Sequence, residues 1–291
     1  MTQPQIAKHE KALVILSGGQ DSTTALFWAK RHFQEVHAVT FDYGQTHCEE
    51  ITAAQRVACL ADVATHHFVK LGPILESTSP LTNPQQPMEQ YNSFEGMQEI
   101  IGARVEKTFV PMRNALFLVL AANRAVATGC GAIVTGICQA DGANYPDCTR
   151  YFINAAQMMV SEAIGQRGCD DDEKVKILSP FLDMPKWTSV HFALGVPGCF
   201  VALAFTHTAY DGKYPPTGKD HANVLRARGF EEAGMPDPLV VRAVMEGLMG
   251  LPNTKNYGDA VQINIIARDI RKAKLKLGLD VDNGTTLGLP E

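Results

Sequence analysis

Residues 13–24 read LVILSGGQDSTT, and this stretch decides the fold. Its first four residues are apolar, which predicts a buried β-strand, and a helical pattern follows over residues 22–33. Between them, Gly18 and Gly19 allow the backbone to turn sharply and to direct successive N–H groups at one point. The positive end of the following helix adds to that field. The sequence therefore predicts an anion-binding turn between a strand and a helix.

Hydroxyl side chains surround this predicted turn. Ser17, Ser22 and Thr23 can each donate a hydrogen bond to an anion held there. No Lys-Ser or Lys-Thr pair follows the glycines, so the stretch is not the Walker-type loop that grips the β- and γ-phosphates of a nucleotide. A purely structural glycine turn is the alternative. The hydroxyl residues directly behind a strand favour a phosphate-binding loop of another kind.

The overall composition favours a globular protein with a small substrate. The 291 residues are enough for one large domain, or for a domain with an appendage, and 45% of them are apolar and 20% charged. The formal net charge is −5 at pH 7. Because an acidic balance gives no electrostatic reason to bind nucleic acid, we expect no nucleic-acid partner.

The sequence predicts neither secretion nor a membrane partner. Residues 1–11 are polar and lack the apolar core of a signal peptide, and the apolar stretches at 115–122 and 195–205 are too short to span a bilayer. The seven cysteines are irregularly spaced and form no CxxC pair, which is typical of reduced thiols. We therefore expect a cytoplasmic protein without a membrane partner.

Strand and helix patterns alternate along the first two thirds of the chain. This alternation predicts an α/β fold with a doubly wound parallel sheet, in which ligands bind beyond the carboxyl ends of the strands. We expect this domain to span residues 11–205, with an excursion over residues 72–107, and a small C-terminal helical lobe to span residues 206–291. A terminal helix over residues 259–277 is expected to dock on the core. The predicted strands are 13–16, 36–41, 67–71, 132–138 and 175–180, and the predicted helices are 22–33, 49–64, 116–128, 149–164 and 186–194.

Four short motifs follow the first turn in order along the chain. They are FDYGQ at 41–45, FVPMRN at 109–114, YPDC at 145–148, and SPF at 179–181 leading to Lys186. With SGGQDS they resemble the QueC family of 7-cyano-7-deazaguanine synthases, and GFEEAG at 229–234 followed by Asp237-Pro238 extends the match. The resemblance covers roughly residues 11–240, and the glycine turn is its most specific part.

This resemblance implies a fold and a reaction. The fold is the adenine-nucleotide alpha-hydrolase (PP-loop, HUP-like) type, and a homodimer is usual for the family. The reaction uses ATP and Mg²⁺ to adenylate the carboxylate of 7-carboxy-7-deazaguanine. Ammonia then displaces AMP to give an amide, and a second adenylation dehydrates the amide to the nitrile. The implied partners are therefore a small 7-deazaguanine carboxylate and an amine donor, and the products include AMP and pyrophosphate.

The resemblance also assigns residues to ATP and to catalysis. Fixed donors aimed at the leaving pyrophosphate lower the barrier, because negative charge builds there when a carboxylate attacks the α-phosphate. Arg113 and Lys186 add full positive charges, and Asp21 is a candidate ligand for Mg²⁺. Arg113 opens a helix whose dipole disfavours a cation at that end, so an anionic ligand explains its place better than stability does. A solvated surface role is the alternative for Lys186. The predicted nucleotide-binding residues are Ser17, Gly18, Gly19, Gln20, Asp21, Ser22 and Thr23.

A second set of residues is assigned to the deazaguanine substrate. A carboxylate such as Asp147 can accept two hydrogen bonds from a guanine-like N–H edge, whereas an ordinary Pro-Asp turn is the alternative. Cys148 is expected to be a packing residue, because the reaction needs no cysteine nucleophile. The predicted substrate-binding residues are Tyr43, Gln45, Asn114, Tyr145 and Asp147.

The sequence departs from the family where the family holds a structural zinc ion with four cysteines. Those positions fall on Ala209, Thr217, Asp220 and Asn223, so no thiolate ligand remains. We therefore expect neither zinc nor another resident metal site, and we expect the lobe to be held by packing, with the C-terminal addition as a candidate for that role.

Three further departures lie close to the predicted chemistry. The family has Arg where this chain has Thr46 and Thr149, and Gly where it has Met112. Because fewer cations lie near the predicted carboxylate substrate, the sequence does not decide which amine accepts the activated carboxyl group. One alternative is a QueC-like paralogue of the kind found in anti-phage defence, which would conjugate the deazaguanine to a protein amine. Another alternative is a non-catalytic nucleotide-binding module.

Overall fold

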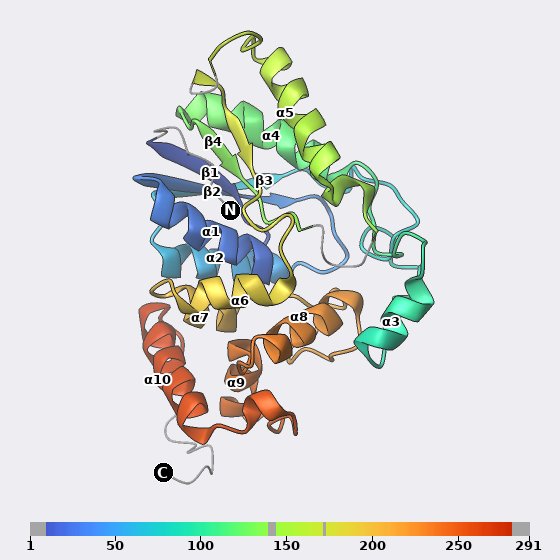
Figure 1. The fold of residues 1–291 in the computed structure, drawn as a ribbon, viewed down its shortest axis with the longest axis vertical. Coiled ribbons are helices and arrows are strands. Elements are labelled where there is room, and N and C mark those ends of the chain that lie inside the picture. The colour runs from blue at the N-terminus through green and yellow to red at the C-terminus, as the bar shows by residue number, and fades with distance from the viewer. Residues whose placement is uncertain (1–9, 139–143, 171–172, 281–291) are drawn as a thin grey trace.

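The computed structural model describes residues 10–138, 144–170 and 173–280. Within these residues, five parallel strands form one sheet in the order β3-β2-β1-β4-β5 (Figure 1). Because the chain builds outward from β1 in both directions, the sheet is doubly wound, and the α/β fold class predicted from the sequence is confirmed. The strands are β1 (Lys11–Ile15), β2 (Glu35–Asp42), β3 (Thr65–Lys70), β4 (Ala132–Val134) and β5 (Lys176–Leu178).

The central strand β1 is apolar throughout its middle because both of its faces are covered. Ala12 lies opposite Val36 of β2 on one side and opposite Ala132 of β4 on the other. Alternate side chains of a strand point to opposite faces, so Val14 packs in one core and Leu13 in the other. A continuous apolar run is what a parallel strand between two helical layers requires.

Helices cover the two faces of the sheet as separate layers (Figure 1). The helices of the first layer share one apolar core with one face of the sheet, and those of the second layer share another with the opposite face. The first layer holds α1 (Gln20–His32), α2 (Glu49–Ala61), α6 (Lys186–Leu194) and α7 (Cys199–Ala202), and the second holds α4 (Arg113–Thr128) and α5 (Arg150–Ala163).

The helix predicted over residues 49–64 and the strand predicted over residues 132–138 each end three or more residues earlier in the structure. Helix α2 stops at Ala61 because Asp62 adopts a left-handed conformation with φ of 51°, and its N–H caps the carbonyls of Ala58 and Cys59. The strand predicted over residues 132–138 is only three residues long. The N–H of Thr135 still donates to the carbonyl of Leu178 at 2.9 Å, but the chain then leaves the sheet.

The excursion over residues 72–107 contains a helix that the sequence analysis did not predict. Helix α3 (Phe94–Ile101) begins after Ser93, whose side chain accepts a hydrogen bond from the N–H of Gly96 at 3.0 Å. Its apolar face packs Met97 and Ile101 with side chains of helix α8 (His221–Glu232). The excursion therefore joins the C-terminal part of the chain to the carboxyl edge of the sheet.

The C-terminal helices form a further core below the first helical layer (Figure 1). Helix α10 (Ala260–Lys276) buries one face against α9 (Pro238–Met245) and the end of α7. Two ion pairs reinforce this packing: Arg226 with Asp237 at 2.6 Å, and Lys274 with Glu246 at 2.8 Å. The division of the chain at residues 205 and 206 stays a prediction.

None of the helices in residues 10–138, 144–170 and 173–280 combines the length and hydropathy needed to cross a membrane.

Candidate active site

A cavity of about 570 Å³ lies beyond the carboxyl ends of β1, β2 and β4. Residues at the carboxyl ends of these strands line the cavity, among them Leu16 after β1, Phe41 near the end of β2 and Thr135 after β4. This is the position at which doubly wound sheets bind ligands, because the strand order reverses between β1 and β4. The volume is that of a typical small-molecule site.

The turn between β1 and α1 is held by its own hydroxyl groups. The Ser22 hydroxyl accepts from the N–H of Ser17 at 3.2 Å and lies 3.0 Å from the Ser17 hydroxyl. The Ser17 hydroxyl in turn accepts from the N–H of Gly19 at 3.3 Å. These contacts fix the loop before any ligand arrives, which is what a preorganised anion cradle needs.

Gly18 allows helix α2 to pack directly on this turn. Its φ is +87°, and a Cβ atom there would lie 2.2 Å from the carbonyl oxygen of Glu50 and 2.7 Å from the N–H nitrogen of Ala54. Only glycine satisfies both the left-handed backbone and the close approach. By contrast, a Cβ atom at Gly19 would meet no atom nearer than 3.5 Å, and Gly19 lines the cavity.

Gly136 is a second close approach, and the sequence analysis did not single it out. A Cβ atom at Gly136 would lie 2.5 Å from the backbone nitrogen of Ser22 and 2.7 Å from the carbonyl carbon of Asp21. The chain leaving β4 therefore lies directly against the first turn of α1. The only signal in the sequence is a glycine following the apolar strand residues at 132–134.

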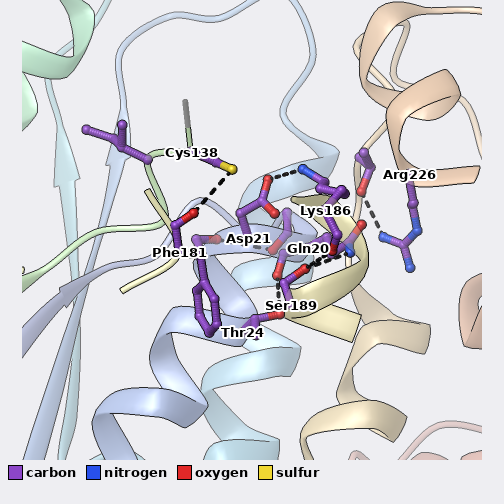
Figure 2. A network of polar contacts seen from close by, with 12 residues as sticks. Gln20, Asp21, Thr24, Cys138, Phe181, Lys186, Ser189 and Arg226 are labelled. Carbon is purple, nitrogen blue, oxygen red and sulfur yellow. Dashed lines mark hydrogen bonds and ion pairs between the residues drawn. The ribbon is translucent and has the colours of Figure 1, made fainter. Parts of the chain in front are cut away.

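Lys186 approaches the turn from the first residue of α6. Its Nζ lies 2.6 Å from Oδ2 of Asp21, and Figure 2 shows the two side chains meeting between α6 and α1. Below them, Gln20 donates to Ser189 at 3.5 Å, which joins the same two helices. Gly229 of α8 makes room for the lysine, because a Cβ atom there would lie 2.7 Å from its Cγ. The cation is thus held at the first turn of α1, next to the predicted anion cradle.

Arg113 is the first residue of α4 and also lines the cavity. Burial acts to lower the pKa of Arg113, but the nearby hydroxyls of Tyr43, Tyr210 and Tyr145 outweigh burial and raise that pKa. The guanidinium therefore stays charged at the end of the helix where the dipole opposes a cation. That arrangement suits an anionic ligand.

The residue before Arg113 adopts a backbone conformation that favours glycine. Met112 adopts a left-handed conformation with φ of 65°, and its side chain is 68% exposed. Glycine reaches this region without strain, so the family's glycine at this position fits the backbone observed here. The methionine occupies a conformation that side chains of its kind rarely adopt.

Glu50 is a cavity residue that the sequence analysis missed. Its Oε1 accepts a hydrogen bond from Nε2 of Gln45 at 3.1 Å, and Oε1 of Gln45 accepts from the N–H of Tyr43 at 3.0 Å. Burial raises the pKa of Glu50 to about 7, although the charge of Arg113 opposes this rise. A carboxyl group in a site with a pKa near neutrality can exchange a proton during a reaction.

The YPDC segment forms another part of the wall. Tyr145 and Cys148 face the cavity, whereas Asp147 is buried behind them. The Asn114 amide donates to the backbone carbonyl of Asp147 at 3.3 Å and so ties α4 to this segment. Burial raises the pKa of Asp147, against the opposing effect of Arg113.

The structure brings most of the predicted site residues to this one cavity. Those that line it are Ser17, Gly19, Gln20, Asp21, Ser22, Tyr43, Arg113, Asn114, Tyr145 and Lys186. Gly18, Thr23, Gln45 and Asp147 do not face it and lie directly behind residues that do. Lining residues that the sequence analysis did not assign include Glu50, Thr135, Gly136, Cys138, His207, Thr208, Tyr210 and His221.

Comparison with known proteins identifies the family. A profile of the family described as "Queuosine biosynthesis protein QueC" matches residues 11–234. The chain belongs to the QueC family. Three relatives named 7-cyano-7-deazaguanine synthase support this assignment. The protein from Gloeobacter violaceus is 44% identical over 232 residues, which cover 79% of this chain and 95% of the relative.

The other two relatives match over similar lengths. The synthase from Laribacter hongkongensis is 39% identical over 234 residues, covering 80% of this chain and 95% of the relative. The synthase from Chromobacterium violaceum is 40% identical over 247 residues, covering 82% and 97%. The QueC match ends at residue 234, so α9 and α10 lie beyond it. The family resemblance inferred from the motifs is thereby confirmed.

The structure shows the surroundings of the positions at which the family resemblance implied zinc-binding cysteines. Asp220 caps α8, because its carboxylate accepts from the backbone N–H of Asn223 at 2.9 Å and from its side-chain amide at 2.6 Å. Burial raises the pKa of Asp220 to about 6. Ala209 is buried. Among the residues that the structure describes, no three His, Cys, Asp or Glu side chains are placed to hold a metal ion.

Proposed function

We propose that this QueC-family protein is an ATP-dependent ligase that adenylates the carboxylate of 7-carboxy-7-deazaguanine and transfers an amine to it. With ammonia as the amine, the first product is the amide and the second is the nitrile, 7-cyano-7-deazaguanine. Each adenylation releases pyrophosphate, and AMP leaves in the step that follows, when ammonia displaces it or the adenylated amide eliminates it. The observation that carries the proposal is one cavity in which the glycine turn, Lys186 and Arg113 converge in a member of this family.

The turn at residues 17–22 is suited to the phosphates of ATP. Gly19 leaves the cavity side open, while Gly18 and Gly136 allow α2 and the end of β4 to pack against the other sides. A nucleotide bound here would meet the backbone of the turn, the Ser17 and Ser22 hydroxyls and the Lys186 ammonium. These groups stabilise the charge that develops on the departing pyrophosphate.

Asp21 is the carboxylate that we assign to Mg²⁺. Its Oδ2 pairs with Lys186, and a carboxylate is the hard ligand type that Mg²⁺ binds together with phosphate oxygens. When bound, Mg²⁺ supplies charge neutralisation on the phosphates. The role of the pair is then to keep the lysine aimed at the same place.

We assign the deazaguanine to the part of the cavity bounded by Tyr43, Asn114 and Tyr145. Arg113 lines the same cavity and lies near Tyr43 and Tyr145, so we assign it to the substrate carboxylate, which must face the α-phosphate of a nucleotide on the turn. The aromatic rings offer flat apolar surfaces to a planar base, and polar atoms of Asn114 and the YPDC segment offer hydrogen bonds to its edge.

Glu50 is the group that we assign to accept a proton from the incoming amine. Attack of ammonia on the adenylated carboxyl carbon forms a C–N bond, AMP leaves, and the nitrogen must lose a proton. The Glu50 carboxylate can take that proton, and its raised pKa makes it a better base than an exposed glutamate. At constant free ammonia, kcat/KM should therefore rise with pH up to about 7, and Glu50→Gln should abolish that rise.

A protein amine is the alternative acceptor, and two observations favour keeping it. Thr149 replaces a family arginine and here caps α5, because its hydroxyl accepts from the N–H of Phe152 at 3.1 Å. Thr46 replaces another arginine, and its hydroxyl donates to the carbonyl of Pro80 at 3.0 Å. Both positions now serve the local backbone and carry no charge, and Thr149 lines the cavity, so the site holds fewer cations than the family pattern implies. Such a paralogue would form the same adenylate.

The experiment is a product analysis by mass spectrometry. The purified protein is incubated with Mg-ATP, 7-carboxy-7-deazaguanine and an ammonium salt. We expect the nitrile together with AMP and pyrophosphate, and Lys186→Met should lower the rate by about a hundredfold or more. AMP with amide or adenylate but no nitrile would favour another acceptor. ADP as the sole nucleotide product would contradict the proposal, and full biological activity of Asp21→Ala would favour the non-catalytic nucleotide-binding module.

A further inference from the structure

The excursion over residues 72–107 contains a buried carboxyl group at its end. Glu106 is 2% exposed, although it lies in a polar segment. The neighbouring cations are used elsewhere: Arg104 pairs with Glu89 at 2.5 Å, and Lys107 pairs with the same residue at 2.9 Å. A buried carboxylate is costly unless hydrogen bonds satisfy its oxygens, so the partners of Glu106 define its role.

Four hydrogen-bonding groups from three residues converge on Glu106. Its Oε1 lies 3.1 Å from the Tyr91 hydroxyl, whose single proton can be donated to Glu106 or to Glu89. Its Oε2 accepts from the N–H of Thr108 at 2.7 Å, from the Thr108 hydroxyl, and from the Tyr145 hydroxyl at 3.2 Å. Tyr91 and Thr108 are themselves buried, whereas Tyr145 is the partner that lines the cavity. Glu106 therefore connects the excursion to the wall of the site.

These contacts fix the direction of the Tyr145 proton. The single proton of the Thr108 hydroxyl is donated to Glu106, so Thr108 acts as an acceptor in its 2.5 Å contact with the Tyr145 hydroxyl. The Tyr145 proton then points to Thr108 or to Glu106, and in both cases away from the cavity. Tyr145 consequently offers the cavity its ring and no donated proton.

The ring of Tyr145 is part of an aromatic series along this wall. Its centroid lies 5.5 Å from that of Phe109, with an interplanar angle of 35°, and 6.4 Å from that of His221, with an angle of 37°. Phe109 follows Glu106 and Thr108 in the same segment. The orientation of the Tyr145 ring is thus set from behind by the hydroxyl network and from the sides by its aromatic neighbours.

We propose that Glu106 is a positioning residue that holds the Tyr145 ring at the angle required to stack on the planar base of the substrate. The inference rests on the proposed function and deepens it. It gives the excursion a purpose, which is to fix one wall of the deazaguanine pocket. The ligand class is a planar heteroaromatic acid, which Tyr145 recognises through ring contact, and hydrogen bonding to the edge of the base is left to other groups.

Glu89 provides a matched control for this role. It is a carboxylate of the same excursion, it also accepts from the Tyr91 hydroxyl, at 2.8 Å, and it does not line the cavity. Glu89→Gln should therefore disturb the excursion without changing the Tyr145 ring. Glu106→Gln keeps the shape of the side chain but replaces one acceptor oxygen with a donor.

The test is equilibrium binding of 7-carboxy-7-deazaguanine and, separately, of a non-hydrolysable ATP analogue, by isothermal titration calorimetry. We expect Glu106→Gln to weaken deazaguanine binding about tenfold while the ATP-analogue affinity stays within about twofold. Tyr145→Phe, which keeps the ring and removes the hydroxyl, should weaken it by a similar factor. The variant that carries both changes should bind the deazaguanine no less tightly than the single variant with the lower affinity, because both changes break the same link. Tyr145→Leu, which removes the ring, should weaken binding further, by about a hundredfold.

Several outcomes would overturn the inference. Wild-type affinity for the deazaguanine in both Glu106→Gln and Tyr145→Phe would contradict the positioning role. So would an equal loss of affinity for both ligands in these variants, if Glu89→Gln shows the same loss. Tyr145→Phe also keeps the test valid if Glu106→Gln does not fold. A wild-type protein that binds the ATP analogue but not the deazaguanine would instead contradict the proposed function, and this inference with it. The wild-type titration thus tests the proposed function, and the ratio of the affinities of the variants tests the role of Glu106.

Discussion

Replacement of Gly136 by alanine tests whether the chain leaving β4 supports the anion-binding turn. The added Cβ atom would lie 2.5 Å from the backbone nitrogen of Ser22, whereas ordinary contacts begin at 3.4 Å. The nearest atoms are all backbone atoms of Asp21 and Ser22, so no side chain can rotate away. The first turn of α1 and residue 136 must therefore separate by about 0.9 Å.

The expected energies follow from this displacement. Overpacking of a well-packed contact costs about 1–3 kcal/mol, and the lower entropy of the unfolded alanine chain offsets about 0.4–1 kcal/mol of that cost. We expect Gly136→Ala to lower the free energy of unfolding by about 1–2 kcal/mol and the Tm by roughly 2–3 °C. A shift of about 1 Å in the cradle should lower kcat/KM for pyrophosphate release by about a hundredfold.

The control is Gly250→Ala, at a position where an added Cβ atom meets nothing within 4 Å and φ is not positive. This variant should keep wild-type activity and a Tm equal to or slightly above that of the wild type. Thermal unfolding and a coupled pyrophosphate assay measure both variants. Wild-type Tm and activity in Gly136→Ala would refute the packing argument. A lowered Tm with unchanged pyrophosphate release would show that the turn is not where ATP reacts.

Three further predictions concern Glu50, Met112 and the C-terminal helix. Because burial raises the pKa of Glu50 to about 7, the folded state holds a proton that the unfolded state releases above about pH 4.5. As pH rises from about 4.5 to 7, the free energy of unfolding of the wild type should therefore fall relative to that of Glu50→Gln, by up to roughly 3 kcal/mol. Urea titrations measure this difference, and parallel pH profiles of the two proteins would contradict it. Met112→Gly should change the free energy of unfolding by less than about 1 kcal/mol, because relief of the left-handed strain offsets the gain in unfolded-chain entropy. Met112→Val should lower it by more than about 1 kcal/mol. Equal thermal melts of the two variants would argue against strain at this residue. Lys274→Met leaves the Glu246 carboxylate without its 2.8 Å partner and should lower the free energy of unfolding by about 2–3 kcal/mol in thermal melts. Adding Glu246→Gln should restore part of that stability. Wild-type stability of Lys274→Met would show that this pair does not hold α10 in place.

Local sequence signals were sufficient where function depends on consecutive residues. The turn at residues 17–22 combines strand, glycines, hydroxyls and helix within one short stretch, so its place at the carboxyl edge followed from the sequence alone. The same holds for Arg113 and Lys186, which stand at helix starts in recognisable motifs. Their meeting in one cavity follows from the parallel sheet, which gathers the carboxyl ends of its strands at one edge.

Residues that act through packing between distant segments could not be predicted in this way. Gly136 matters because it touches α1, and Glu50 matters because α2 packs on the turn through Gly18. In the sequence, Glu50 is one acidic residue in the first turn of an amphipathic helix, where acidic residues are common. His207 and His221 line the cavity only because the C-terminal helices fold back over the first helical layer. Periodicity in the sequence does not report such tertiary approaches.

The excursion shows the same limit. Helix α3 is only eight residues long and is flanked by turns, so its apolar pattern is too short to stand out among neighbouring Pro, Asn and Gln residues. It is stabilised by packing of Met97 and Ile101 on α8, which lies more than a hundred residues further along the chain. The role of Glu106 depends on that placement and is visible only in the folded chain.

The most direct test of the account follows oxygen from the substrate. 7-Carboxy-7-deazaguanine labelled with ¹⁸O in both carboxylate oxygens is incubated with the protein, Mg-ATP and ammonium, and AMP is analysed by mass spectrometry. Adenylation of the carboxylate predicts that each AMP formed carries one ¹⁸O atom, that two AMP form per nitrile, and that an amide product keeps one label. With a protein amine as acceptor, AMP would still carry one label and the conjugate would keep the other. AMP without ¹⁸O would contradict carboxylate adenylation and with it the proposed function.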